Sequence, residues 1–184
     1  MKRLITIALG TLLISAGAFA QDEAAIEKAV KPAPANQKAN ATVVKFKADG
    51  TYDTLRKGTG ALVCYDKSGL PGQQPAVNIE CTNMGNLERA AQNIKFESLG
   101  DRKKTQEALD AAEKDGTRVK PVFGSVWYHM RGADLDHTNM HVTIAVPGAT
   151  EKTMGLPETA QAAKGGVWIM NAGTSTAHLM TPGE

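Results

Sequence analysis

The order of the hydrophobic patterns along the chain constrains its fold more than any other feature. Strand-like alternation comes first, two helix-like segments follow near the middle, and the last third is rich in β-branched and aromatic residues. Strands and helices do not alternate regularly, as they would in a parallel βαβ sheet. The pattern therefore predicts an α+β fold: a single domain with a mainly antiparallel sheet and one or two helices inserted between two groups of strands.

The first strand group shows the period of half-buried strands. Val44 and Phe46 alternate with lysines, and Asp49 and Gly50 follow as the signal of a tight hairpin turn. The strands expected in this group cover residues 44–47, 52–55 and 61–65, with a glycine-rich turn at 58–60.

Two helices are expected after this group. Apolar residues at i, i+3, i+4 and i+7 between Leu87 and Ile94 form one helical stripe, with Asn86 as its expected N-cap. A second, mostly polar helix is expected at 105–114. The strands expected after the helices cover residues 119–130, 140–146, 167–170 and 177–180.

The first twenty residues have the parts of a secretory signal peptide. A basic start at Lys2 and Arg3 precedes an apolar run over 4–14, and Ala-Phe-Ala at 18–20 is a small-x-small cleavage signature. The run is short for a bilayer span, and no cysteine follows the cleavage signature for lipid attachment. We therefore expect a periplasmic or secreted protein without a stable membrane anchor.

The domain boundaries follow from this cleavage site and from a proline-rich segment. Removing 20 residues from the 184 leaves 164, the size of one domain. Removing Lys2 and Arg3 from the 21 basic residues leaves 19, which balance the 19 acidic ones. Such a chain lacks the clustered positive field of nucleic-acid-binding proteins. Prolines at 31–35 indicate a flexible leader over residues 21–40, with the globular domain at 41–184.

The chain has only two cysteines, Cys64 and Cys81, seventeen positions apart. In an oxidising compartment an even pair predicts a disulfide, and closing the loop between them would contribute roughly 3 kcal/mol. The alternative is a catalytic thiol beside a base, which would need an electropositive environment.

All four histidines lie in the last third of the chain, and three of them are candidates for a binding site. His141 opens an apolar strand on which it shares one face with Thr143, while Met140 before it is expected to point into the core. Imidazoles brought together from separate strands could bind a metal ion or hydrogen-bond a polar ligand as neutral donors and acceptors. The residues expected to line a ligand pocket are His141, His178, His129 and Arg131.

A copper or zinc site is one interpretation of the same region. His178 and Met180 share a face of the last expected strand, and imidazole with thioether suits copper(I), whereas imidazole alone suits zinc or copper(II). The expected ligands are His141, His178 and Met180. The alternative is structural: methionines fill gaps in the core, and histidines bond to the backbone or to water.

The motifs of common enzyme classes are absent from the sequence. It has no Gly-x-Ser-x-Gly elbow, no phosphate-binding loop and no His-Glu-x-x-His, and Asp134 and Asp136 lack the glycine and glutamate of a calcium loop. No catalytic residue is assigned. One alternative is still a hydrolase in which a histidine acts as general base beside Asp134, Asp136 or Glu158.

Four short motifs carry a resemblance to known proteins. They are Leu-Arg-Lys-Gly-Thr-Gly at 55–60, Tyr-His-Met-Arg-Gly at 128–132, Gly-Gly-Val-Trp-Ile-Met at 165–170 and Gly-Thr-x-x-Ala-His-x-Met at 173–180. Together they resemble a family of small exported bacterial proteins of uncharacterised function. The resemblance implies a single exported domain and no activity, with Cys64, Cys81, His141 and His178 at matching positions.

These observations favour an exported, non-enzymatic domain that binds a small ligand or a metal ion. Its partner would be an unidentified small molecule or protein, and not nucleic acid. A hydrolase and a purely structural or interaction protein are the two alternatives.

Overall fold

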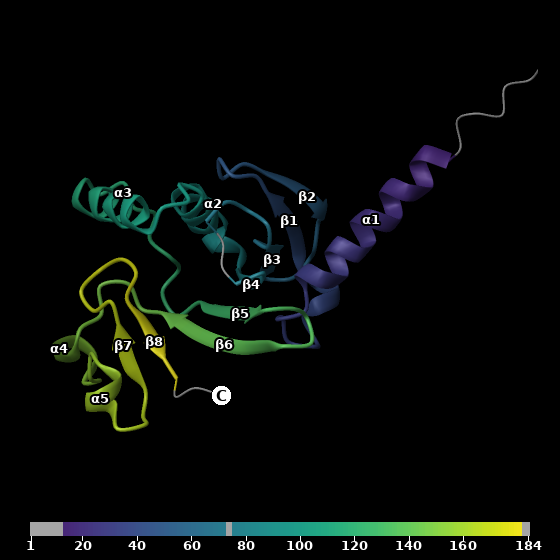
Figure 1. Cartoon of the computed structure of the whole chain (residues 1–184). Helices are drawn as coiled ribbons and strands as arrows, with labels where there is room; N and C mark the ends of the chain where they lie inside the picture. Colours follow the sequence, from purple (N-terminus) through teal and green to yellow (C-terminus); the bar gives the residue numbers. More distant parts are fainter. Residues whose placement is uncertain (1–12, 73–74, 182–184) are drawn as a thin grey trace, which may run out of the picture.

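The structure, a computed structural model, describes residues 13–72 and 75–181 of the chain (Figure 1). The strands are β1 (Thr42–Phe46), β2 (Tyr52–Arg56), β3 (Leu62–Asp66), β4 (Val77–Asn83), β5 (Val126–Gly132), β6 (Thr138–Ala145), β7 (Trp168–Met170) and β8 (His178–Met180). The helices are α1 (Leu13–Ala29), α2 (Leu87–Glu97), α3 (Arg102–Lys114), α4 (Glu151–Met154) and α5 (Ala160–Ala163), with 3-10 turns η1 (Lys38–Asn40) and η2 (Met84–Asn86).

All eight strands belong to one sheet, in the order β2-β1-β3-β4-β5-β6-β8-β7. Neighbouring strands are antiparallel except β1 and β3, which run parallel. The helices α2 and α3 stand between β4 and β5 in the chain. The predicted α+β fold, with helices inserted between two strand groups, is therefore confirmed.

The parallel pairing of β1 and β3 explains the glycines between β2 and β3. The connection must pass the start of β1 at close range, and a Cβ on Gly58 would lie only 2.2 Å from the backbone oxygen of Asn40. Gly60 donates its backbone N–H to the same oxygen at 2.8 Å. A side chain at Gly58 would therefore force this crossing apart.

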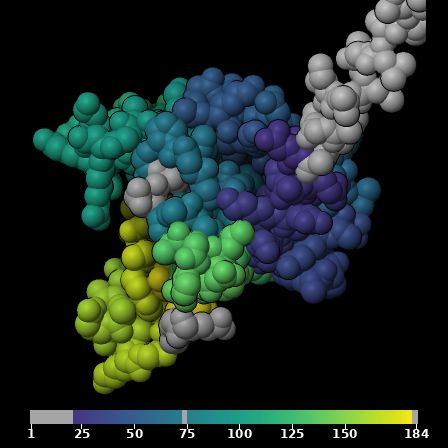
Figure 2. Space-filling model, turned by 45° about the vertical axis from the view of Figure 1, so that its right-hand side comes forward, coloured from purple at the N-terminus to yellow at the C-terminus, as the bar shows by residue number. Residues whose placement is uncertain are grey.

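The segment expected to be a flexible leader packs against the sheet instead. Ile26, Ala29, Val30 and Ala33 are each at least nine-tenths buried, in one cluster with Leu62 and other residues of the sheet. Figure 2 shows the purple N-terminal residues lying against the blue body of the protein. The prediction of a loose leader over 21–40 is wrong here, because burying these apolar side chains is more favourable than leaving them in water.

Part of the predicted signal peptide, residues 1–12, lies outside the described residues. The backbone of α1 starts at residue 13 and runs past the predicted cleavage site. None of the described helices is long and apolar enough to cross a membrane.

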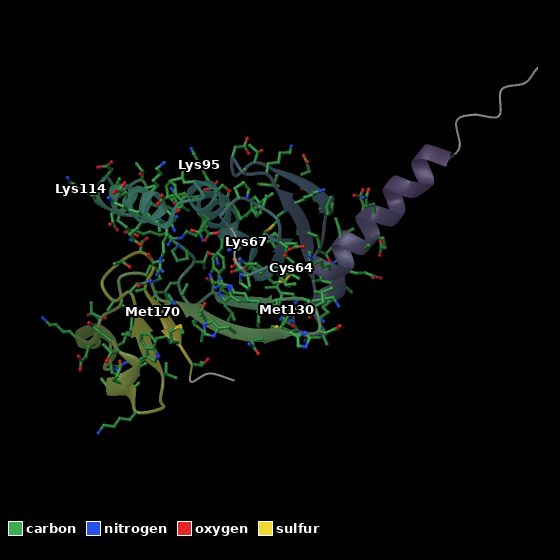
Figure 3. The ribbon with its side chains drawn as sticks, in the orientation of Figure 1. Cys64, Lys67, Lys95, Lys114, Met130 and Met170 are labelled. Atoms are coloured by element: carbon green, nitrogen blue, oxygen red, sulfur yellow. A yellow bond between two sulfur atoms is a disulfide. The ribbon has the colours of Figure 1, made fainter. Side chains whose placement is uncertain are left out.

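The predicted disulfide is present. Cys64 and Cys81 face each other across the antiparallel pair β3 and β4, and both are fully buried beneath the N-terminal segment (Figure 3). The thiol-nucleophile alternative is thereby excluded, since the structure contains no free cysteine in its described residues. The bond joins β3 to β4, the strand that also carries Glu80.

The opposite face of the sheet is covered by α2. Ala90 and Ile94 of the predicted helical stripe are fully buried there against Val63 and Tyr65. Asn86 occupies the N-cap position of α2 as expected, but its side chain makes no capping hydrogen bond. Its buried amide instead donates to the hydroxyls of Thr82 and Ser125, which ties α2 to β4 and β5.

Two expectations for the second strand group are wrong. Residues 119–125 are not part of a strand, because Pro121 has no N–H for a ladder and Gly124 turns the chain with φ 75°. Met140 is 37% exposed rather than in the core. It lies near the free end of the β5–β6 hairpin, where β8, which pairs with β6 only from Thr143 onward, does not reach.

The C-terminal part of the chain forms a small lobe on the sheet. Val146, Ala149, Ile169 and Ala177 make a separate apolar cluster there, beneath β7 and β8. Figure 2 shows this part, in yellow-green, projecting from the rest of the body. The lobe brings β8, and with it His178, to the edge of β6.

Candidate functional site

A cavity of about 400 Å³ lies between the sheet and α2. Its floor is formed by side chains on one face of β4, β5, β6, β7 and β8, and its roof by residues of α2. Lys67 and Met170, labelled in Figure 3, stand at two sides of it. The site is thus assembled from segments far apart in the sequence.

Three of the four histidines converge on this cavity. His129 and His141 face each other across the β5–β6 pair, and His178 joins them from β8. Arg131 and Met180 also line the cavity. All residues expected to line a ligand pocket are therefore found around one cavity.

The remaining histidine is elsewhere. His137 lies in the exposed β5–β6 loop, where its Nδ1 is 2.8 Å from a carboxylate oxygen of Asp134. Asp136 and Glu158 do not line the cavity either, and Glu158 accepts the backbone N–H of Glu151. The carboxylates named for a histidine base are therefore not beside the cavity histidines.

One wall of the cavity is an aromatic stack. The ring of Trp127 lies 6.3 Å from that of His129 with 12° between the planes, and His129 lies 5.9 Å from His141 with 29°. Trp127 and His129 are alternate residues of β5, and His141 lies opposite His129 on β6, so the three side chains lie on one face of the sheet. Because the planes are nearly parallel, the rings face one another, and the row borders the cavity with aromatic surface that a ring-shaped ligand can contact.

A buried carboxylate organises the base of the cavity. Glu80 is 3% exposed, accepts a hydrogen bond from the Tyr65 hydroxyl at 2.9 Å, and pairs with Lys67 at 2.9 Å and with Arg131 at 3.1 Å. Its Oε1 also lies 3.2 Å from Nδ1 of His129. Burial alone would raise the pKa of Glu80, but the cations around it hold that pKa well below its usual range.

The ammonium group of Lys67 is the second centre of this network. It is 3% exposed and lies between Glu80 and Glu97, at 2.9 Å and 3.1 Å. Burial lowers the pKa of Lys67, but the two carboxylates outweigh that effect and raise it. Burial and the nearby Glu80 charge raise the pKa of Tyr65 well above its usual value, so its hydroxyl stays a donor.

The structure also defines the protonation of two cavity histidines. Nδ1 of His178 lies 2.8 Å from the backbone oxygen of Thr176, and a carbonyl oxygen only accepts, so Nδ1 carries the proton and Nε2 is left as an acceptor. Burial lowers the pKa of His178. Burial also lowers the pKa of His141, and nearby cationic groups, Arg131 among them, add to the effect. Both rings are therefore neutral at pH 7.

The expected metal site, with ligands His141, His178 and Met180, stays a prediction. Within residues 13–72 and 75–181, no group of three or more His, Cys, Asp or Glu side chains is arranged to hold a metal ion. His141, His178 and Met180 all line the cavity, as two imidazoles and one thioether.

Sequence reasoning missed the polar roof of the cavity. Arg89, Asn93 and Glu97 recur at four-residue spacing on α2 and all line the cavity. This spacing is visible in the sequence, but it is also that of an ordinary solvated helix face. Only the packing of α2 on the sheet shows that this face borders a cavity.

Comparisons with models of protein families, with curated proteins and with solved structures find no match for this chain, so the resemblance to exported bacterial proteins stays a prediction.

Proposed function

We propose that this protein is a non-enzymatic binding domain that holds a small polar molecule in the cavity between α2 and the sheet, in the periplasm or outside the cell. A buried disulfide and the predicted signal peptide support the location. The size of the cavity, about 400 Å³, falls within the range of small-molecule sites in proteins.

One observation carries the proposal: the cavity histidines keep ring nitrogens that no described residue uses. His141 makes no hydrogen bond to any residue in the described part of the chain, and His178 uses only Nδ1. The unused nitrogens of His141 and His178 are not among the buried atoms without a partner, so a molecule in the cavity can reach them. Neutral rings with unused nitrogens, beside an aromatic wall, are typical of a site that hydrogen-bonds a ligand.

The test is a ligand-observed NMR screen of small polar organic molecules against the mature protein. We expect compounds that bind the wild type to show no binding to His141→Ala or His178→Ala. They should still bind His137→Ala, which removes a histidine outside the cavity. Circular dichroism would establish that the variants fold. Binding that survives both cavity substitutions would contradict the proposal.

A second candidate function rests on a line of three groups in the same cavity. Oγ1 of Thr143 lies 3.3 Å from Nε2 of His129, whose Nδ1 lies 3.2 Å from Glu80. The order matches that of nucleophile, base and orienting carboxylate in hydrolases, although Nδ1 of His129 makes no hydrogen bond to a described residue. The hydrolase alternative thus has Glu80 in place of the carboxylates expected from the sequence.

Hydrolysis of p-nitrophenyl acetate tests this alternative. If the alternative holds, the wild type hydrolyses the ester faster than the buffer blank, and Thr143→Val does not. The control Thr138→Val changes a threonine of the same strand outside the cavity and should keep the wild-type rate. Equal rates in both variants would exclude Thr143 as a nucleophile.

A further inference from the structure

The charged groups around the cavity are not balanced. Three cations line it, Lys67, Arg89 and Arg131, against two carboxylates, Glu80 and Glu97. Lys67 lies between both carboxylates, and Arg131 contacts Glu80. Both carboxylates of the lining are therefore paired with Lys67 or Arg131, and the charge of Arg89 gives the lining a net positive charge.

Arg89 is buried and only partly used by the protein. Its side chain belongs to a residue that is 2% exposed, and Nη1 donates to the backbone oxygen of Val119 and, at 3.0 Å, to the hydroxyl of Ser175. Both acceptors are neutral. Nε and Nη2 donate to no described residue, and no carboxylate in the described part of the chain lies within ion-pair distance of the guanidinium.

Glu113 forms no ion pair with Arg89, although both side chains contact Ser175. Glu113 contributes to the electrostatics of Arg89, but its carboxylate is bound to the backbone N–H and the hydroxyl of Ser175. Burial, together with the neighbouring Arg118, lowers the pKa of Arg89 to about 10. The guanidinium therefore stays protonated at pH 7. Burying a cation whose donors have no acceptor costs free energy unless an anion pairs with it.

The site also has a surface for the rest of such an anion. The stacked rings of Trp127, His129 and His141 line the same cavity as Arg89. Nε2 of His178, an acceptor, lines it as well. A molecule with a flat ring and a charged end would thus meet aromatic rings and a guanidinium group within one cavity.

We propose that the ligand of this cavity is a small ring compound that carries an oxyanion, either a carboxylate or a phosphate ester. Its anionic group pairs with Nε and Nη2 of Arg89, and its ring lies along the wall formed by Trp127, His129 and His141. This inference rests on the proposed function, because it names the chemistry of the molecule that the same cavity binds. An arginine presents two parallel N–H donors that match two oxygens of either anion.

The test uses four probes of similar size and different charge: benzoate, phenyl phosphate, benzamide and benzylamine. Each is titrated into the wild-type protein, and the indole N–H signal of Trp127, assigned with the variant Trp168→Phe, reports binding by NMR. We expect benzoate or phenyl phosphate to bind about tenfold to hundredfold more tightly than benzamide, the equivalent of one charge-assisted pair. Benzylamine is expected to bind weakest. The stronger of the two anions identifies carboxylate or phosphate as the preferred group.

Substitution of the arginine gives the second arm. Arg89→Gln should abolish the preference of the cavity for the anion over benzamide, and Arg89→Lys should keep only part of it. The matched control is Arg56→Gln, since Arg56 is also partly buried and bound to backbone oxygens, but outside the cavity. The probe selectivity of the wild type stands even where Arg89→Gln fails to fold.

The outcomes separate the inference from the proposed function. Benzamide or benzylamine binding as tightly as the anions, or an anion preference that survives in folded Arg89→Gln, would overturn the inference and leave ligand binding intact. Absence of any shift at Trp127 with all four probes would contradict both.

Discussion

Replacing Glu80 by glutamine tests the charge network beneath the cavity. The variant keeps the shape of the side chain but removes the negative charge that Lys67, Arg131 and His129 surround at 2.9–3.2 Å. Breaking a buried ion pair by neutralising one partner costs about 3–5 kcal/mol. Lys67 keeps Glu97 as a second partner at 3.1 Å, so we expect a loss close to 3 kcal/mol in the free energy of unfolding at pH 7.

The pH dependence of the unfolding free energy shows whether the negative charge of Glu80 stabilises the folded protein. Because the folded protein holds the pKa of Glu80 below its usual value, the ionised carboxylate stabilises the wild type fully above about pH 5, and this contribution is lost as the pH falls through the lowered pKa. Urea unfolding followed by circular dichroism at pH 7 and at pH 3 should therefore show a gap between wild type and Glu80→Gln that narrows on acidification. The control is Glu88→Gln, an exposed position expected to change stability by less than about 0.5 kcal/mol. A Glu80→Gln protein as stable as Glu88→Gln at pH 7 would refute the reasoning.

Three further predictions concern the fold and use the same urea assay. Gly58→Ala should lower the free energy of unfolding by more than about 2 kcal/mol, because its Cβ would lie 2.2 Å from a backbone oxygen. The control Gly69→Ala, where there is open space but φ is 80°, should lower it by about 1 kcal/mol. Equal losses would contradict the close crossing at Gly58. Ile26→Ala should lower the free energy of unfolding by about 2–4 kcal/mol if the N-terminal segment is core, and an unchanged midpoint would show that this segment is not. Replacing Cys64 and Cys81 together by alanine should cost about 3 kcal/mol, and an unchanged midpoint would contradict a stabilising disulfide.

Local patterns in the sequence were sufficient for much of the fold. The alternation at Val44 and Phe46 and the apolar stripe of α2 both correspond to observed elements. Parity along the strands also placed His141 with Thr143, and His178 with Met180, on shared faces, and all four line the cavity. These features depend on neighbours within a few residues, which a sequence displays directly.

The remainder depends on contacts between distant segments. The packing of residues 26–33 had a signal, an apolar spacing of i, i+3, i+4 and i+7, but the prolines at 32 and 34 are equally typical of a linker. Glu80 alternates with apolar residues of β4, and nothing near it in the sequence indicates that its partners are Lys67, His129 and Arg131. The role of Arg89 likewise cannot be predicted locally, since it depends on which face of α2 meets the sheet.

Native mass spectrometry tests the central claim, that the cavity holds a small molecule, most directly. The protein would be purified without a metal-affinity step and weighed under native and denaturing conditions, together with His137→Ala and His178→Ala. We predict that the native wild type and His137→Ala are heavier than their denatured chains by the mass of one small organic molecule, and that His178→Ala is not. Equal native and denatured masses for the wild type would contradict the account.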